Sequence, residues 1–331
     1  MTYSGNMDFD FTFSRFEVDI RFIADAYLPL WKGNTLRSAF GLALREITCN
    51  RREDCGECLL RKKCHYSYLF DTSPPEDAPV LRKQGDIARP FILEAPNLRK
   101  REFKRGERTK FYFTLFGRGI EYFPYFLVAI REMGERGLGK GYKKGSGRFV
   151  IEGVNAVDEI NGKKITIYED DTVLNRSLEM MYQDILSGSE EWDGELKLIF
   201  TTPTQIKKDG RFITDPDFRT LISRLLFRVN MIGTFHCGKM LYDEEGVREI
   251  LEVCEGVELK RRNVNVMDYM ERYSRVQGKK IKIPTFFVGE LVYDGSFSRD
   301  LMALIELGRF THVGKLATFG CGKYEVERDW K

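Results

Sequence analysis

Apolar residues stand at every second position near the start of the chain, at 11 and 13 and again at 16, 18, 20 and 22. This period of two predicts a strand that buries one face. Over 36–47 the apolar residues recur at three- and four-residue spacing, which predicts a helix with Asn34 or Thr35 as its cap. Further strands are predicted at 111–115 and 148–154, with a second helix at 122–133 between them.

The same order of elements returns in the second half. Strands are predicted at 196–200, 282–293 and 324–326, and helices at 221–229 and 301–307. Strand, helix, strands, helix, strand is the order of a ferredoxin-like unit. We therefore predict an α+β protein with two tandem ferredoxin-like (RRM-like, βαββαβ) domains. The expected bounds are 1–155 for the first domain, 156–192 for a connector and 193–331 for the second domain.

A glycine-rich segment occurs twice, because residues 137–152 match residues 312–327 at a constant offset of 175. Each copy follows a predicted helix and leads into a predicted strand, so tandem units explain the repeat. A basic loop rich in glycine presents backbone N–H groups without side-chain obstruction, which suits a polyanion. The candidate contacts are Lys140, Gly145, Gly147, Arg148, Gly314, Gly320, Gly322 and Lys323.

Composition limits the class of protein. The 331 residues are 42% hydrophobic and carry 53 basic against 50 acidic side chains, so any basic surface must come from local segregation. The sequence has no apolar run that could span a membrane, and MTYSGNMDFDF does not have the pattern of a secretory signal. We therefore expect a cytoplasmic protein.

Two stretches are locally basic. Residues 260–282 combine eight Lys and Arg with Tyr269 and Tyr273, a mixture that suits RNA through phosphate contacts and base stacking. Candidate contacts there are Arg275, Lys279 and Lys280. Residues 99–110 carry seven Lys and Arg against two Glu, and a solvated surface hairpin explains them at least equally well.

Four of the seven cysteines lie within residues 49–64, as Cys49, Cys55, Cys58 and Cys64. Four thiols this close together in a polar segment predict a structural metal site. Tetrahedral zinc and a 4Fe–4S cluster both take four thiolates, and the spacing does not separate them.

Several segments resemble one known family. FTTPTQIKKDGRF, RYSRVQGKKIKI and HVGKLATFGCGKYEV in the second half, with LPLWKGNTLRSAFGLALRE and RPFILEAP in the first, resemble the CRISPR-associated endoribonucleases of the RAMP superfamily that process precursor crRNA. The resemblance covers most of the chain, and HVGK…FGCGKYEV is its most specific part. It implies glycine loops that help to hold CRISPR repeat RNA. It also implies metal-independent cleavage within the repeats, leaving a 5′-hydroxyl and a 2′,3′-cyclic phosphate.

Many members of that family are thought to carry a catalytic histidine on or near the first helix, but residues 28–47 contain none. Metal-independent cleavage needs a base, an acid and cations that hold the developing charge. His312 starts the second glycine loop three residues before Lys315, so we predict these two as the catalytic pair. The alternatives are His236, which sits where a structural histidine is more common, and Lys32 with Arg37, which would stabilise charge and orient the RNA.

Two other functions remain open at this point. One is a subunit that holds crRNA within a CRISPR effector complex without cleaving it, which the missing helix histidine favours. The other is an iron–sulfur electron carrier on a ferredoxin-like fold. That second function explains the cysteines but not the two glycine loops or the basic stretches.

Overall fold

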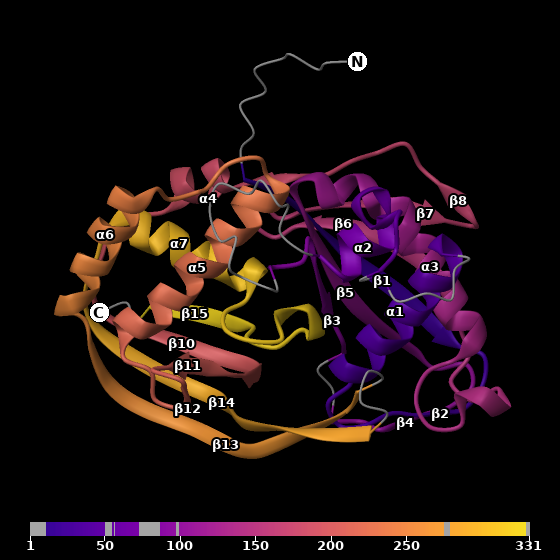
Figure 1. Cartoon of the computed structure of the whole chain (residues 1–331). Coiled ribbons are helices and arrows are strands. Elements are labelled where there is room, and N and C mark those ends of the chain that lie inside the picture. The colour runs from indigo at the N-terminus through magenta and orange to yellow at the C-terminus, as the bar shows by residue number, and fades with distance from the viewer. Residues whose placement is uncertain are drawn as a thin grey trace.

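A computed structural model describes residues 11–49, 55, 57–72, 87–96, 99–274 and 279–328, without the side chains of 268–274, 279 and 280. The first domain is an antiparallel sheet whose strands lie in the order β3-β5-β1-β6-β7-β8, with β9 beside β1 (Figure 1). Its strands are β1 (Thr12–Phe22), β3 (Phe91–Glu94), β5 (Arg108–Phe116), β6 (Phe149–Asp158), β7 (Lys163–Glu169), β8 (Thr172–Val173) and β9 (Met180–Met181).

Two helices, α1 (Gly33–Thr48) and α3 (Phe123–Arg136), pack against each other and cover one face of this sheet. Leu36, Phe40 and Leu44 are four residues apart on α1 and are all buried, as the sequence period predicts. The strand order β3-β5-β1-β6 is the ferredoxin-like order. Shorter elements attached to this domain are β2 (Ala26–Tyr27), β4 (Glu102–Phe103) and α2 (His65–Phe70).

The second domain repeats this plan. Its antiparallel sheet has the order β13-β14-β10-β15, and α5 (Phe218–His236) and α7 (Arg299–Thr311) cover one face. The strands are β10 (Trp192–Thr204), β13 (Glu258–Ser274), β14 (Lys279–Phe297) and β15 (Tyr324–Arg328). Further elements are α4 (Tyr182–Gly188), α6 (Glu244–Val253) and the hairpin β11 (Ile206–Lys208) with β12 (Arg211–Ile213). The predicted tandem ferredoxin-like architecture is therefore confirmed.

Two local predictions were wrong, and one strand was not predicted. Helix α1 begins at Gly33 after Lys32, and no side-chain cap bond is made there, so neither Asn34 nor Thr35 is its cap. Strand β1 is buried on both faces, because ion pairs cover its polar side chains, including Arg15. The sequence analysis gave no strand at 258–274, where the charged residues hide the strand period of β13.

The segment expected to connect the domains, 156–192, supplies β7, β8 and β9 to the first sheet and the helix α4. Strands β6 and β7 pair as an antiparallel hairpin on either side of Gly162.

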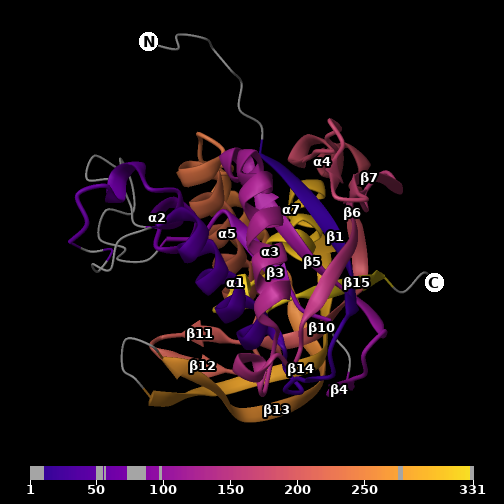
Figure 2. The same cartoon turned by 90° about the vertical axis from the view of Figure 1, so that its right-hand side faces the viewer.

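The two domains share packed surfaces, and Figure 2 shows them closely apposed. The ring centroids of Phe13 and Phe310 lie 4.9 Å apart, and both residues belong to contiguous buried core. His236 Nε2 is 2.7 Å from the carbonyl oxygen of Ala88, which joins the end of α5 to the first domain. Within the described residues, none of the helices has the length and apolar character that a membrane crossing requires.

Candidate nucleic-acid interface

The two glycine loops, residues 137–148 and 312–323, have the same backbone hydrogen bonds. Leu138 N–H donates to Gly147 O at 2.9 Å, and the equivalent Val313 N–H donates to Gly322 O at 3.0 Å. Further bonds of the first loop recur 175 residues later, such as Gly145 N–H to Tyr142 O and Gly320 N–H to Ala317 O. The repeat seen in the sequence is thus a repeat in three dimensions.

At one equivalent position the two loops carry chemically different residues. Gly137, at the start of the first loop, has φ 87° and ψ 162°, a conformation that is open essentially to glycine alone. Its counterpart is His312, which holds φ 57° and ψ 166°. A strained backbone persists at a non-glycine residue only where the surroundings hold it, so the His312 side chain needs an explanation.

The environments of the loops differ. The second loop packs on the first domain, where a Cβ on Gly320 would lie 2.8 Å from Leu93 O. Its 3₁₀ turn, η5 (Ala317–Phe319), is buried. The equivalent turn of the first loop, η3 (Tyr142–Lys144), is exposed and basic. Lys140 and Arg148 are exposed as well, so the first loop presents more exposed positive charge to a polyanion than the second loop does.

His312 is fully buried beside Glu94 of β3. Its Nδ1–H donates to Cys321 O at 3.0 Å, which ties the two ends of the loop together. Its Nε2 has no hydrogen-bond partner among the described residues and lies 3.6 Å from Glu94 Oε1. Burial lowers the pKa of His312, although the Glu94 carboxylate opposes that shift. This geometry keeps the imidazole away from solvent.

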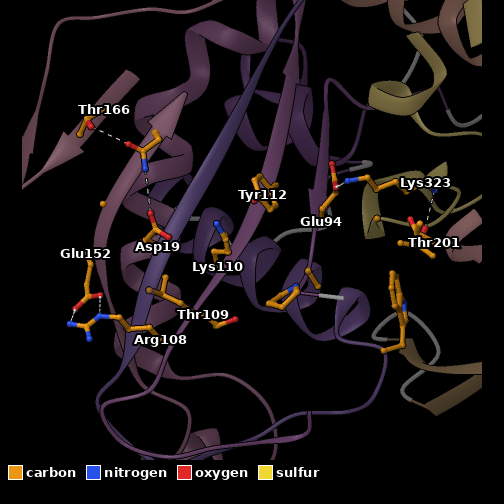
Figure 3. Close-up of a pocket in the computed structure, with 18 of the residues that line it drawn as sticks. Asp19, Glu94, Arg108, Thr109, Lys110, Tyr112, Glu152, Thr166, Thr201 and Lys323 are labelled. Carbon is orange, nitrogen blue, oxygen red and sulfur yellow. Dashed lines mark hydrogen bonds and ion pairs between the residues drawn. The ribbon is translucent and has the colours of Figure 1, made fainter. Parts of the chain in front are cut away.

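Glu94 is the centre of a buried ion-pair cluster. Arg15 donates to both of its carboxylate oxygens, and Lys323 Nζ donates to Oε2 at 2.8 Å. Burial alone would raise the pKa of Glu94, but Arg15, His312 and Lys323 outweigh it and hold that pKa well below its usual value. Lys323, predicted as an RNA contact, is thus engaged with a carboxylate (Figure 3).

The cleft drawn in Figure 3 has a volume of about 900 Å³ and lies between the open faces of the two sheets. Five carboxylates line it against three cations, and the cations are paired: Arg108 with Glu152, Lys110 with Glu17, and Lys323 with Glu94. Such a lining is poorly suited to a run of phosphates.

A second pocket, here called the basic pocket, has the opposite character. It has a volume of about 450 Å³ and lies where α1 meets the second glycine loop. Among the described residues its walls contain no carboxylate and six cations: Arg37, Arg89, Lys207, Arg224, Arg228 and Lys315. Because like charges repel when they are not compensated, this surface favours an anionic ligand.

Two arginines show how the basic pocket is built. Arg37 Nε donates to Thr318 Oγ1 at 3.1 Å, and its guanidinium lies 4.1 Å from the Phe70 ring and 4.3 Å from the Phe319 ring. Arg228 donates through Nε to Thr311 O, but its buried Nη2 has no hydrogen-bond partner among the described residues. Burial and the nearby charge of Arg89 lower the pKa of Arg228 to about 10.

The predicted catalytic residues are therefore separated. Lys315 and Arg37 both line the basic pocket, whereas His312 is not among its lining residues. Lys32 is buried, and its Nζ donates to Leu30 O at 3.2 Å. His236 is also buried, between Ala88 O and the Tyr68 hydroxyl, and burial lowers its pKa to about 4.

Four residues of the basic pocket were not identified from the sequence: Arg89, Lys207, Arg224 and Arg228. A signal existed for two of them, because Arg224 and Arg228 stand four residues apart and therefore lie on one face of α5. Of the basic stretch, Arg275 lies outside the described residues, and only the backbone is described at Lys279 and Lys280.

The four cysteines border α1 and α2, and each is half-buried. Burial raises the pKa of the Cys55 thiol; Arg45 opposes the shift, and Asp71, Cys64 and Cys49 add to it, so three thiols share one neighbourhood. Among the described residues, however, no three His, Cys, Asp or Glu side chains are gathered as a metal site. The donor types suit zinc or iron–sulfur chemistry, but their arrangement here does not form the site, which stays a prediction.

Comparison with known sequences places both halves of the chain. The AF_1859_N family, an N-terminal domain, matches residues 11–180. The family of the CRISPR-associated endoribonuclease Cas6 matches residues 198–324. An uncharacterized protein of Archaeoglobus fulgidus is 24% identical over 325 residues, which are 97% of this chain and 99% of that protein.

Solved structures show the same fold. The partial Cas6-RT-Cas1–Cas2 complex matches with a TM-score of 0.57 at 12% identity over 98% of this chain, which spans 47% of that longer chain. Thermus thermophilus Cas6 (TTHB231) matches with a TM-score of 0.53 at 13% identity over 96% of this chain and 99% of its own. A Cas6 (TTHB231) product complex matches with a TM-score of 0.54 at 17% identity, covering 95% and 100%. The chain thus belongs to the AF_1859_N family, and its residues 198–324 are similar to the family of the CRISPR-associated endoribonuclease Cas6.

Proposed function

We propose that this protein is an endoribonuclease that binds precursor crRNA and cleaves it within the CRISPR repeats. The match of residues 198–324 to the family of the CRISPR-associated endoribonuclease Cas6 supports the reaction class. The observation that carries the proposal is the basic pocket, where six Arg and Lys side chains from both domains line one cavity. A phosphodiester is the anion that an RNA-processing protein would bind there.

The proposed reaction is an internal transfer at one phosphate. The 2′-hydroxyl loses its proton and attacks the adjacent phosphorus, so a P–O2′ bond forms and the P–O5′ bond breaks. The leaving O5′ takes up a proton, and the products are a 2′,3′-cyclic phosphate and a 5′-hydroxyl. The substrate supplies the nucleophile, so the reaction consumes neither water nor a redox partner.

The side chains of the basic pocket are suited to the charge that builds on the phosphate. Arg37 is fixed by Thr318 and two aromatic rings, so it needs little reorganisation to hold an oxyanion. Lys315 is exposed at the rim, and Arg228 also lines the pocket. Magnesium and calcium prefer oxygen ligands, chiefly carboxylates, and the described walls of the pocket contain no carboxylate. This donor set supports a metal-independent reaction that depends on cations and positioning.

His312 has a positioning role in this proposal. Its Nδ1–H bond to Cys321 O and its place beside Glu94 hold the loop that carries Lys315. The proton-transfer role predicted from the sequence would require the buried imidazole to reach the RNA. The His312 variants described in the Discussion separate the two roles.

The proposed partner is CRISPR repeat RNA, with other CRISPR proteins as further partners. The similar structures support this, since one holds a Cas6 (TTHA0078) product complex and another a Cas6-RT-Cas1–Cas2 complex. The four cysteines, with zinc or a 4Fe–4S cluster, would have a structural role beside α1, and the proposed cleavage does not pass through them.

The direct test is incubation of the purified protein with its own repeat RNA in EDTA, followed by mapping of both ends. We expect cleavage at one position in the repeat, with the two end groups given above. Cleavage that requires a divalent metal, or that leaves a 3′-hydroxyl, would contradict the proposed chemistry.

A second candidate function is a crRNA-binding subunit without nuclease activity. It is favoured by the burial of His312 and His236, and by the absence of any histidine from the described walls of the basic pocket. Tight binding of repeat RNA that stays intact in the same experiment, with and without divalent metal, would establish this function instead.

A further inference from the structure

A third pocket, here called the α1 pocket, lies between α1, the end of α3 and the first glycine loop. Its volume of about 590 Å³ is typical of ligand sites, which span about 300–1,000 Å³. The walls are largely apolar and include the aromatic rings of Trp31 and Tyr142, and the ion-paired Glu46 and Arg136 also line it. The Nε1 of Trp31 is a buried donor with no acceptor among the described residues.

The two copies of the repeat differ in exposure: the 3₁₀ turn of the second loop is buried, whereas that of the first loop is exposed. In the second loop, η5 is buried against α1 and β3, and Phe319 packs beneath the Arg37 guanidinium. The equivalent η3 turn has the same backbone hydrogen bonds but leaves Tyr142 39% exposed. The same framework therefore carries an aromatic side chain toward solvent, where a stacking partner can reach it.

The charges around the α1 pocket indicate what that partner is. Lys140, Lys143, Lys144 and Arg148 are all exposed, and none has an ion-pair partner within the part of the chain that the structure describes. Aromatic side chains beside a basic loop are the usual platform for single-stranded RNA, in which bases stack and cations hold the backbone. A purely apolar partner would make no charge interaction with these four side chains.

We propose that the α1 pocket accepts one unpaired base of the bound RNA, with neighbouring phosphates on the lysines of the first glycine loop. The base would stack on Tyr142, and Trp31 lines the same pocket. The inference rests on the proposed function, because it needs an RNA ligand. It gives the protein a base-reading site separate from the basic pocket where cleavage is proposed.

The test combines an abasic scan of the repeat RNA with the variant Tyr142→Leu, which keeps an apolar side chain but loses the aromatic face. Affinity is measured for wild type, Tyr142→Leu and the control Tyr125→Leu, a half-buried tyrosine on α3 outside the pocket. We expect one unpaired position where removal of the base weakens wild-type binding about tenfold. At that position the loss should disappear in Tyr142→Leu and persist in Tyr125→Leu.

The outcomes separate this inference from the proposed function. If repeat RNA binds and is cleaved, but every abasic position costs wild type and Tyr142→Leu the same affinity, the base-reading site is excluded and the nuclease proposal stands. If wild type does not bind repeat RNA at all, both proposals are overturned. As a second measurement, 2-aminopurine at the sensitive position should be quenched on binding wild type and brighter on Tyr142→Leu.

Discussion

The Nε2 atom of His312 lies 3.6 Å from Oε1 of Glu94, and this contact joins the second glycine loop to a strand of the first domain. His312 has a positive φ, as does Gly137, the glycine at the equivalent position of the first loop. The same carboxylate also binds Lys323, which ends the loop. One buried acid thus meets both ends of the loop that carries Lys315 into the basic pocket.

We predict that His312→Gly is more stable than His312→Ala, by on the order of 1 kcal/mol in the free energy of unfolding. Both variants lose the imidazole, but only glycine is relaxed at φ 57°. Denaturant titration of the two proteins measures the difference. Equal stabilities would mean that the loop relaxes away from this conformation once the side chain is gone.

The cleavage rate of His312→Asn separates positioning from proton transfer. Asparagine tolerates positive φ better than most residues, and its amide can donate to Cys321 O as the imidazole does. If His312 positions the loop, His312→Asn should recover most of the rate lost in His312→Ala. Should both variants lose about 100-fold or more in rate, the imidazole itself carries the proton, as the sequence analysis predicts.

Glu94→Gln should alter the acid stability of the protein. The folded-state pKa of Glu94 lies below its unfolded value, so its contribution is fully present above about pH 4.3 and is lost as the pH falls through the folded pKa. Removing this charge near Arg15 should cost about 3 kcal/mol at pH 7, as for other buried pairs. The variant should then lose less stability than wild type between pH 5 and pH 2, about the range in which carboxylates titrate. Parallel pH profiles of unfolding would contradict this account.

The sequence predicted the fold well wherever a strand or helix keeps its period in one continuous segment. Helix α1 is an example, with Leu36, Phe40 and Leu44 at helical spacing on its buried face. Burial of Arg15 on β1 could not be predicted in the same way, because its partners Glu94 and Glu159 come from distant segments. A local sequence pattern does not show which polar side chains will be in contact in the folded protein.

The candidate site was predicted only in part for the same reason. Lys315 and Arg37 were named from the sequence, but nothing in it showed that they share a pocket with Arg89 and Arg228. The position of His312 in the loop suggested contact with RNA. Its environment depends instead on Glu94, which is 218 residues away in the chain (312 − 94 = 218).

Lys315→Ala should weaken binding of repeat RNA and reduce the slope of log K against log salt by about one phosphate contact. The double variant with Arg224→Ala should reduce the slope by about two, since both residues line the basic pocket. Lys163→Ala, an exposed lysine on β7, serves as the control and should leave the slope unchanged. An unchanged slope for Lys315→Ala would place the RNA elsewhere.

Cys58→Ser tests the predicted metal site. If Cys49, Cys55, Cys58 and Cys64 hold a structural metal, the anaerobically purified protein should carry zinc or iron in a fixed ratio, and the variant should lose it. The melting temperature of the variant should also fall, because binding energy at such a site is folding energy. Elemental analysis that finds neither metal in wild type would remove the site from consideration.

The repeat offers a matched pair of glycines for the last prediction. Gly145 and Gly320 are equivalent, with φ 86° and 77°, so alanine should carry a similar conformational cost of about 1–2 kcal/mol at either position. At Gly145 the new Cβ would meet no atom within 4 Å, whereas at Gly320 it would lie 2.8 Å from Leu93 O. Gly320→Ala should therefore destabilise the protein by about 1–3 kcal/mol more than Gly145→Ala, as other overpacked sites do. Gly320→Ala should also slow cleavage by displacing Lys315, while Gly145→Ala leaves the basic pocket intact. Equal losses of stability would show that the second loop does not press on β3 as the geometry requires.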